Sequence, residues 1–189
     1  GEKPGVGDGI IGGPALDAYA VTLDFTTKEL ILRRGKDARA PQPADGNYTI
    51  SETFRYHGGK ILLPLRAAEI PIWSIVDSGS SVDIFSLRLA RSLSKDLPKE
   101  RIREGSQPLA VGVGNTESKM QYLLFPERMT LRFGHDGGKG SFYQPTSMGL
   151  SILDTQISPA MGVEISFLLG MPTLRLYERV TFDYPRRLL

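Results

Sequence analysis

The segment that most constrains this chain is Asp77-Ser78-Gly79-Ser80-Ser81, which directly follows the apolar run 70–76. An apolar run of this length, rich in branched side chains, predicts a buried strand. A carboxylate at the end of a buried strand costs free energy unless it is hydrogen-bonded or used in chemistry. The segment therefore predicts a functional carboxylate at Asp77. The alternative is structural: Asp77 only caps a turn, together with Ser78 and Ser80.

A glycine-centred element near the C-terminal end supplies a second constraint. Leu168-Leu169-Gly170 follows Asp77 by about ninety residues and leads to the apolar segment Val180 to Tyr184. A glycine is expected where one chain segment passes close behind another, because a Cβ would collide there. We therefore expect Leu168, Leu169 and Gly170 to pack directly behind the loop that contains Asp77 and Gly79.

The same pattern occurs near the N-terminal end, at Ile10 to Phe25. This N-terminal repeat (10–25) and the C-terminal repeat (168–184) share apolar-apolar-Gly-x-Pro-x-Leu-x-x-Tyr. Both continue with Val-Thr-apolar-Asp-aromatic, offset by a single residue. Matches over this many positions indicate an internal duplication. We expect Val21–Phe25 and Leu30–Leu32 to form strands in one sheet with Val180–Tyr184.

Together these residues resemble the retropepsin and pepsin-like aspartic peptidases. The active-site loop of that family is apolar-apolar-Asp-Thr/Ser-Gly, and each lobe closes with two apolar residues and a glycine threaded past the loop. The resemblance implies a mainly β fold, an aspartic-protease-like closed β-barrel lobe with one or two short helices. It implies a bacterial-type two-lobe protein, with residues 1–34 as the tail of a preceding lobe, 35–46 as a linker and 47–189 as the second lobe. The alternative is a single retropepsin-like lobe with an extra hairpin.

The function implied by the resemblance is an aspartic endopeptidase acting on polypeptide. Asp77 would be one of two carboxylates that share a proton and activate a water. Gly79 would offer its N–H to that carboxylate, Ser78 would brace the two loops, and Ser80 would lie close to the carboxylate. One lobe supplies one aspartate, so the partner is the missing first lobe of the same protein or a second copy in a homodimer.

Two other functions stay open. A non-catalytic lobe of the same fold could serve binding or assembly, and an unrelated β-rich binding module could use Asp77 only in a turn. In the family, a hairpin folds over the substrate as a flap, and the tip Gly112, Gly114, Asn115 and Thr116 is the candidate. An ordinary surface hairpin fits that segment equally well.

The rest of the chain predicts further elements. Segments 61–65 and 70–76 form a hairpin around a turn at 66–69, and Met129 to Phe133 forms a strand. Ser86 caps a helix that carries Leu89, Leu93 and Leu97 and ends at Pro98. Residues 141–165 have too little periodicity for a prediction.

Composition excludes several classes of function. The 189 residues suit one domain, and 21 Gly with 13 Pro suit a β-rich, turn-rich chain. A net charge of +2 gives no reason to expect a nucleic-acid partner, and no apolar stretch is long enough to span a membrane. The chain has no cysteine and two separated histidines, so we predict no metal site and no cofactor. The compartment stays open, with a periplasmic or secreted location preferred.

Overall fold

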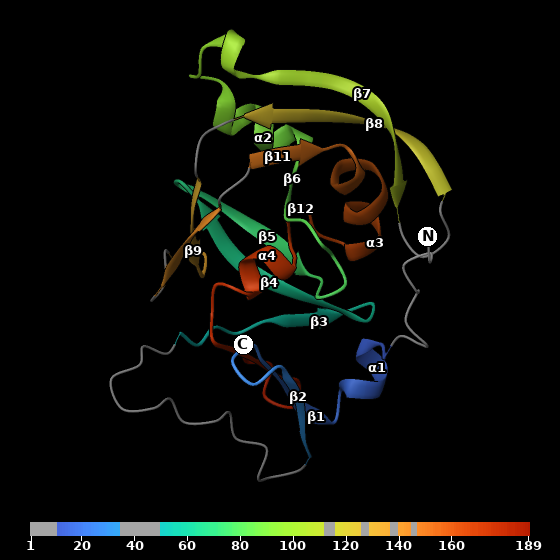
Figure 1. Cartoon of the computed structure of the whole chain (residues 1–189), viewed down its shortest axis with the longest axis vertical. Helices are drawn as coiled ribbons and strands as arrows, with labels where there is room; N and C mark the ends of the chain where they lie inside the picture. Colours follow the sequence, from blue (N-terminus) through green and yellow to red (C-terminus); the bar gives the residue numbers. More distant parts are fainter. Residues whose placement is uncertain (1–10, 35–49, 112–115, 126–128, 137–139, 145–146) are drawn as a thin grey trace.

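The computed structural model describes residues 11–34, 50–111, 116–125, 129–136, 140–144 and 147–189, with the backbone alone at 107–111, 116–118, 143–144 and 147. The described chain is mainly β, with short helical segments (Figure 1). The strands are β1 (Tyr19–Asp24), β2 (Glu29–Arg34), β3 (Arg55–His57), β4 (Lys60–Ala67), β5 (Ile70–Val76), β6 (Ile84–Ser86), β7 (Arg103–Val111), β8 (Thr116–Phe125), β9 (Met129–Phe133), β10 (Ser141–Gln144), β11 (Ser147–Leu150), β12 (Ile165–Leu169) and β13 (Arg179–Asp183). The α-helices are α1 (Gly13–Leu16), α2 (Leu87–Ser94), α3 (Ser158–Met161) and α4 (Met171–Leu174), with a 3-10 turn at Lys99–Arg101 and a π-helical turn at Leu153–Ile157.

The larger sheet has the strand order β10-β9-β4-β5-β12-β6-β11-β8-β7, and β3 pairs with β4. Its central feature is β12, which comes from the far end of the chain and lies between β5 and β6. β12 runs parallel to β5 and antiparallel to β6. The strand therefore fills the space between the two arms of the loop 77–83, which joins β5 to β6.

The smaller sheet has the order β13-β1-β2 and lies below the larger sheet in Figure 1. β1 pairs antiparallel with β13, from Ala20 opposite Asp183 to Asp24 opposite Arg179. β2 pairs with the other edge of β1. This confirms the predicted sheet between the N-terminal and C-terminal repeats.

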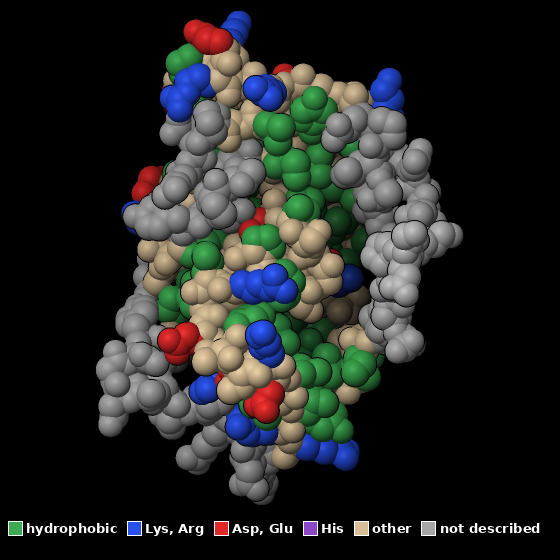
Figure 2. All heavy atoms as spheres, viewed as in Figure 1, with side chains coloured by type: hydrophobic (Ala, Val, Ile, Leu, Met, Phe, Trp, Pro, Cys, Tyr) green, Lys and Arg blue, Asp and Glu red, His purple; other side chains and the backbone are tan. Residues whose placement is uncertain are grey.

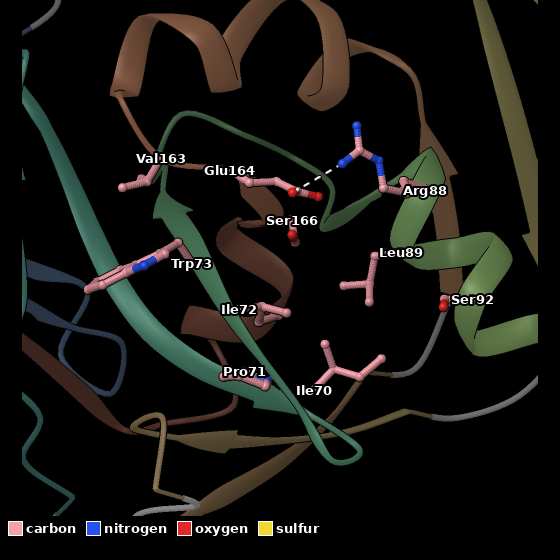
Figure 3. Close-up of a pocket in the computed structure, with 10 residues that line it drawn as sticks. All are labelled: Ile70, Pro71, Ile72, Trp73, Arg88, Leu89, Ser92, Val163, Glu164 and Ser166. Atoms are coloured by element: carbon pink, nitrogen blue, oxygen red, sulfur yellow. Dashed lines mark hydrogen bonds and ion pairs between the residues drawn. The ribbon is translucent and has the colours of Figure 1, made fainter.

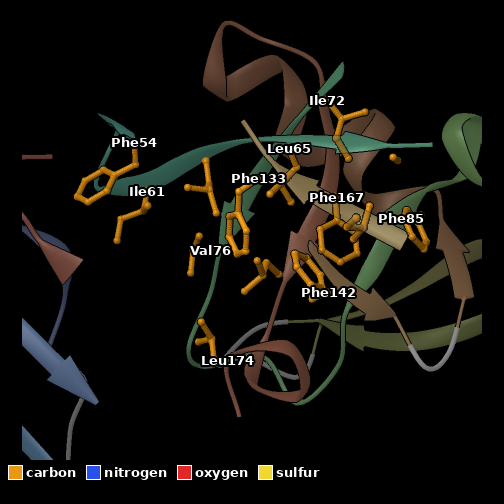
Figure 4. Close-up of a cluster of buried hydrophobic side chains, with 14 of the residues drawn as sticks. Phe54, Ile61, Leu65, Ile72, Val76, Phe85, Phe133, Phe142, Phe167 and Leu174 are labelled. Atoms are coloured by element: carbon orange, nitrogen blue, oxygen red, sulfur yellow. The ribbon is translucent and has the colours of Figure 1, made fainter. Parts of the chain in front are cut away.

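The core lies between the strands of the larger sheet and against β13, and it is rich in phenylalanine (Figure 4). Phe85 and Phe167 are fully buried, with ring centroids 4.9 Å apart. Phe133 and Phe142, from neighbouring strands β9 and β10, lie 5.4 Å apart. Burying each aromatic side chain removes a large apolar area from water, so these rings stabilise the sheet order strongly.

The predicted hairpin of β4 and β5 is present, with a turn shorter than expected because β4 extends to Ala67, whereas β5 spans the predicted residues. The predicted helix α2 begins where expected: the N–H of Leu89 donates to Ser86 Oγ at 3.1 Å. It ends at Ser94, earlier than predicted, so Leu97 lies beyond the helix in the turn before Pro98, where its N–H donates to the Ser94 carbonyl at 3.0 Å.

One part of the predicted architecture needs correction. Among the described strands the order of the larger sheet ends at β10 on one side and β7 on the other, and these two strands do not pair. The predicted closed barrel is therefore not what the described strands form, because β7 and β8 extend beyond the sheet as a long hairpin (Figure 1). The segment 141–165, which has too little periodicity for a prediction, contains β10, β11 and the turns that lead into α3.

The face drawn in Figure 2 mixes hydrophobic, basic and acidic side chains. Lys and Arg side chains are scattered over this face, with apolar side chains exposed between them. The helices within the described ranges are all too short or too polar to cross a bilayer.

Candidate active site

The strand β5 delivers Asp77 to the surface at its C-terminal end. The strand is buried at Ile72 and from Ser74 to Val76, and Asp77 is half-buried. The N–H of Asp77 donates to the carbonyl of Leu169 at 2.9 Å, which continues the ladder between β5 and β12. The carboxylate therefore lies at the first residue after a strand that is paired on both sides, with β4 and with β12.

The loop after Asp77 holds the carboxylate in place. The N–H of Gly79 donates to Asp77 Oδ1 at 2.9 Å, and the N–H of Ser80 donates to the Asp77 carbonyl at 3.1 Å. The contact from Gly79 is the one predicted for this glycine. Ser78 and Gly79 are exposed, so the loop opens to solvent. The use of the carboxylate in catalysis remains a prediction.

Ser78 and Ser80 lie in different surroundings. The hydroxyl of Ser80 donates to the carbonyl of Val82 at 2.7 Å, so it braces its own loop. The predicted position of Ser80 close to the Asp77 carboxylate stays a prediction. Ser78 is exposed at the turn, as a residue that contacts a facing loop would have to be.

Gly170 lies behind this loop, at the end of β12. A Cβ on Gly170 would come within 2.3 Å of the Val82 carbonyl oxygen and 2.9 Å of the Ser80 carbonyl oxygen. The next residue, Met171, donates its N–H to that Ser80 carbonyl at 2.9 Å. Leu168, Leu169 and Gly170 are thus brought together with 77–82, and only glycine fits at the crossing.

A second carboxylate, Asp83, was missed from the sequence. Asp83 is buried, and its Oδ1 accepts the N–H of Gly170 at 2.6 Å while its Oδ2 accepts the hydroxyl of Thr173 at 3.0 Å. It therefore ties β12 and α4 to the loop. The available signal was a carboxylate between the apolar residues Val82 and Ile84, because a buried charge requires hydrogen-bond partners.

The remaining predicted site residues belong to the candidate flap. β7 and β8 form the predicted hairpin, pairing from Arg103 opposite Leu124 to Val111 opposite Thr116. Thr116 begins β8, whereas Gly112, Gly114 and Asn115 lie outside the described residues. Within the described ranges no group of three or more His, Cys, Asp and Glu is placed to hold a metal ion.

A pocket of about 470 Å³ lies at the opposite end of β5 from Asp77 (Figure 3). Its mouth carries the exposed ion pair Arg88–Glu164, with a nitrogen–oxygen distance of 3.1 Å. The lining residues come from the start of β5, from α2 and from the approach to β12: Ile70, Pro71, Ile72, Trp73, Arg88, Leu89, Ser92, Val163, Glu164 and Ser166. The pocket is separated from Asp77 by the length of the strand, so it forms no part of the candidate carboxylate site.

Comparisons with known proteins give a faint likeness only. No family model matches the chain, and no curated protein matches it. Among solved structures the chain is similar to a retropepsin-like aspartic protease from Rickettsia conorii, with 18% sequence identity and a TM-score of 0.38. The likeness covers 66% of this chain and 76% of that one. At this level of similarity no residue role passes from that protein to this chain.

Proposed function

We propose that this chain is one lobe of an aspartic-type endopeptidase, in which Asp77 is one of two carboxylates that activate a water for attack on a peptide bond. The observation that carries the proposal is the placement of Asp77. A half-buried carboxylate stands at the end of a central strand and is held by the N–H of Gly79, in a loop where Ser78 and Gly79 are exposed. If Asp77 only capped a turn, β12 would not need to end directly behind the loop. It ends so close to the loop that one added methyl group at Gly170 would collide with it.

The chemistry requires a second carboxylate from a partner lobe. Two carboxylates in close contact cannot both ionise easily, so they share a proton and titrate as a coupled pair. The ionised member takes a proton from a water held between them, and the protonated member polarises the carbonyl of the scissile bond. The hydroxyl of Ser78, exposed beside Asp77, would hydrogen-bond to the facing loop.

The substrate of such a site is an extended, unfolded polypeptide, which needs access to both carboxylates at once. The β7–β8 hairpin is the candidate cover for the bound peptide. The chain by itself would be half of a site. A non-catalytic lobe used in assembly would share the fold and differ in the result of the assay below.

The test uses a duplicated protein, in which a second copy of residues 50–167 is inserted into the full chain directly before Ile10. Each glycine-centred repeat then follows a lobe body, and each body carries its own Asp77. We expect this protein to cleave reduced casein best at acidic pH, where the pair holds one proton. Asp77→Asn in either body keeps the size of the side chain and should abolish cleavage, whereas Ser78→Ala should reduce it less. Equal cleavage by wild type and Asp77→Asn would rule out the proposal.

A further inference from the structure

The two repeats meet each other across a local twofold axis. Thr22 and Thr181 are opposite each other in the β1–β13 ladder, and their hydroxyls lie 2.8 Å apart. The two residues are 159 positions apart, which is also the offset between the matching Val-Thr segments of the repeats. Equivalent residues therefore pair with each other at this point. The neighbouring pairs are equivalent too. Val21 lies opposite Phe182, and their counterparts in the other repeat, Val180 and Leu23, also lie opposite each other.

The elements around the axis match as well. α1 and α4 are both four-residue helices that begin directly after a glycine and carry proline at an early position. Asp24 and Asp183 each accept N–H groups from the turn that follows them, at 3.0 Å. The N-terminal repeat thus has the same local structure as the C-terminal repeat, related to it by the axis.

The surroundings of the two repeats differ in one respect. Leu169 is 1% exposed and Gly170 is crossed by the loop 80–82, whereas the equivalent Ile11 is 63% exposed. A Cβ on the equivalent Gly12 would meet only its own neighbour Pro14, at 3.7 Å, among the described residues. The N-terminal repeat therefore carries the residues of a closing crossing, and no loop among the described residues crosses it as the loop 80–82 crosses Gly170.

We infer that the surface at Ile11 and Gly12 is the docking site for the Asp-Ser/Thr-Gly loop of a second β lobe, one that lacks a closing segment of its own and receives this one. The inference rests on the proposed function, because that loop would bring the second carboxylate. Because the local twofold axis relates Gly12 to Gly170, the docked loop would cross Gly12 in the same way as the loop 77–83 crosses Gly170.

A second copy of this chain does not fit that position. Its own loop 77–83 is already closed by Leu169 and Gly170. If a second copy were placed by the local twofold axis, its β13 would occupy the position of this chain's β1, and the two strands would collide. The partner is therefore a lobe of the same kind whose last strand is supplied by this chain.

The equivalent contacts define the chemistry of the docked loop. Met171 donates its N–H to the Ser80 carbonyl, and Gly170 donates to the Asp83 carboxylate. The partner loop should therefore present a backbone carbonyl to the N–H of Gly13 and a polar acceptor to the N–H of Gly12. Position 15 is alanine where position 173 is threonine, so this acceptor needs no equivalent of the hydrogen bond between Asp83 and the Thr173 hydroxyl.

The oligomeric state of the chain tests the choice of partner. In sedimentation velocity the chain should remain a monomer at concentrations of tens of micromolar. A twofold dimer that is disrupted by Ser78→Trp would overturn the inference, because a second copy would then occupy the position reserved for a different lobe.

Hydrogen exchange tests the docking site itself, with the duplicated protein as the probe. The amides of Gly12 and Gly13 should exchange at least about tenfold more slowly in the duplicated protein than in the chain, as expected for newly buried groups. Gly12→Val should abolish that protection in the duplicated protein and leave the melting temperature of the chain unchanged. Exchange at the same rate in both proteins, whether or not the added body folds, would overturn the inference. Protection without casein cleavage would instead retain the docking site and reject the peptidase.

Discussion

The N–H of Gly170 donates to Asp83 Oδ1 at 2.6 Å, and this bond fixes the strand that passes behind Asp77 to the loop that carries it. Asp83 also accepts the hydroxyl of Thr173, in the first turn after the crossing. One buried carboxylate thus sets the distance between β12, α4 and the candidate catalytic loop. The position of Asp77 depends on this contact, although Asp83 itself lies in the protein interior.

Removing the carboxylate of Asp83 should destabilise the chain. Asp83→Ala leaves a buried N–H and a buried hydroxyl without their acceptor, at a cost of about 2–4 kcal/mol. Asp83→Asn keeps one acceptor oxygen and should cost less. Urea unfolding of both variants, with the exposed Asp96→Ala as a control, measures the difference. An Asp83→Ala variant as stable as the control would contradict the assigned role.

A methyl group at Gly170 should be costly because of the crowding at the crossing. The Cβ of Gly170→Ala would have to displace two backbone carbonyls, and overpacking of this kind costs about 3 kcal/mol. Gly12→Ala is the matched control, because both glycines have extended backbone that alanine adopts without strain. Thermal melting should show a fall of several degrees for Gly170→Ala and none for Gly12→Ala. A similar shift for both variants would mean that backbone flexibility, rather than crowding, sets the requirement.

The junction of β1 and β13 should weaken in acid. The backbone N–H of Thr27 lowers the pKa of Asp24 below its ordinary 3.8, and the guanidinium of Arg179 acts in the same direction. Because the folded pKa is the lower one, this stabilisation is present above about pH 3.8 and is lost as the pH falls through the folded pKa. Asp24→Asn should therefore lose less stability than wild type from about pH 5 to about pH 2. Parallel pH profiles of the melting temperature would refute this.

The core around β12 should be sensitive to truncation. Phe167 is fully buried against Phe85, so Phe167→Ala should cost about 3–5 kcal/mol. Phe167→Leu keeps most of the volume and should cost less than half of that. The exposed Leu176→Ala provides a control that should stay within about 0.5 kcal/mol of wild type. Denaturant unfolding checks the order, and a loss for Leu176→Ala equal to that for Phe167→Ala would contradict it.

The sequence predicted the features that depend on local patterns. The apolar run 70–76 forms β5, and Ser86 caps α2 by accepting an N–H three residues ahead. The internal duplication predicted that β1 and β13 share a sheet, because equivalent segments with equal hydrophobic patterns suit the same type of pairing. The motif also predicts the requirement for glycine at position 170. It does not predict which atoms crowd that position, the carbonyls of Ser80 and Val82.

The tertiary structure alone decided which strands are neighbours and which polar groups meet. β12 lies between β5 and β6, and Asp83 meets Gly170 across 87 positions of the chain. Such contacts depend on how distant segments pack together, and no local pattern of apolar residues specifies that packing. The same holds for the order of the larger sheet, which ends at β7 and β10 without closing. The chain's own residues thus fix where the carboxylate loop stands and what must pass behind it. That no described loop crosses Gly12 becomes visible only when the two repeats are compared in three dimensions.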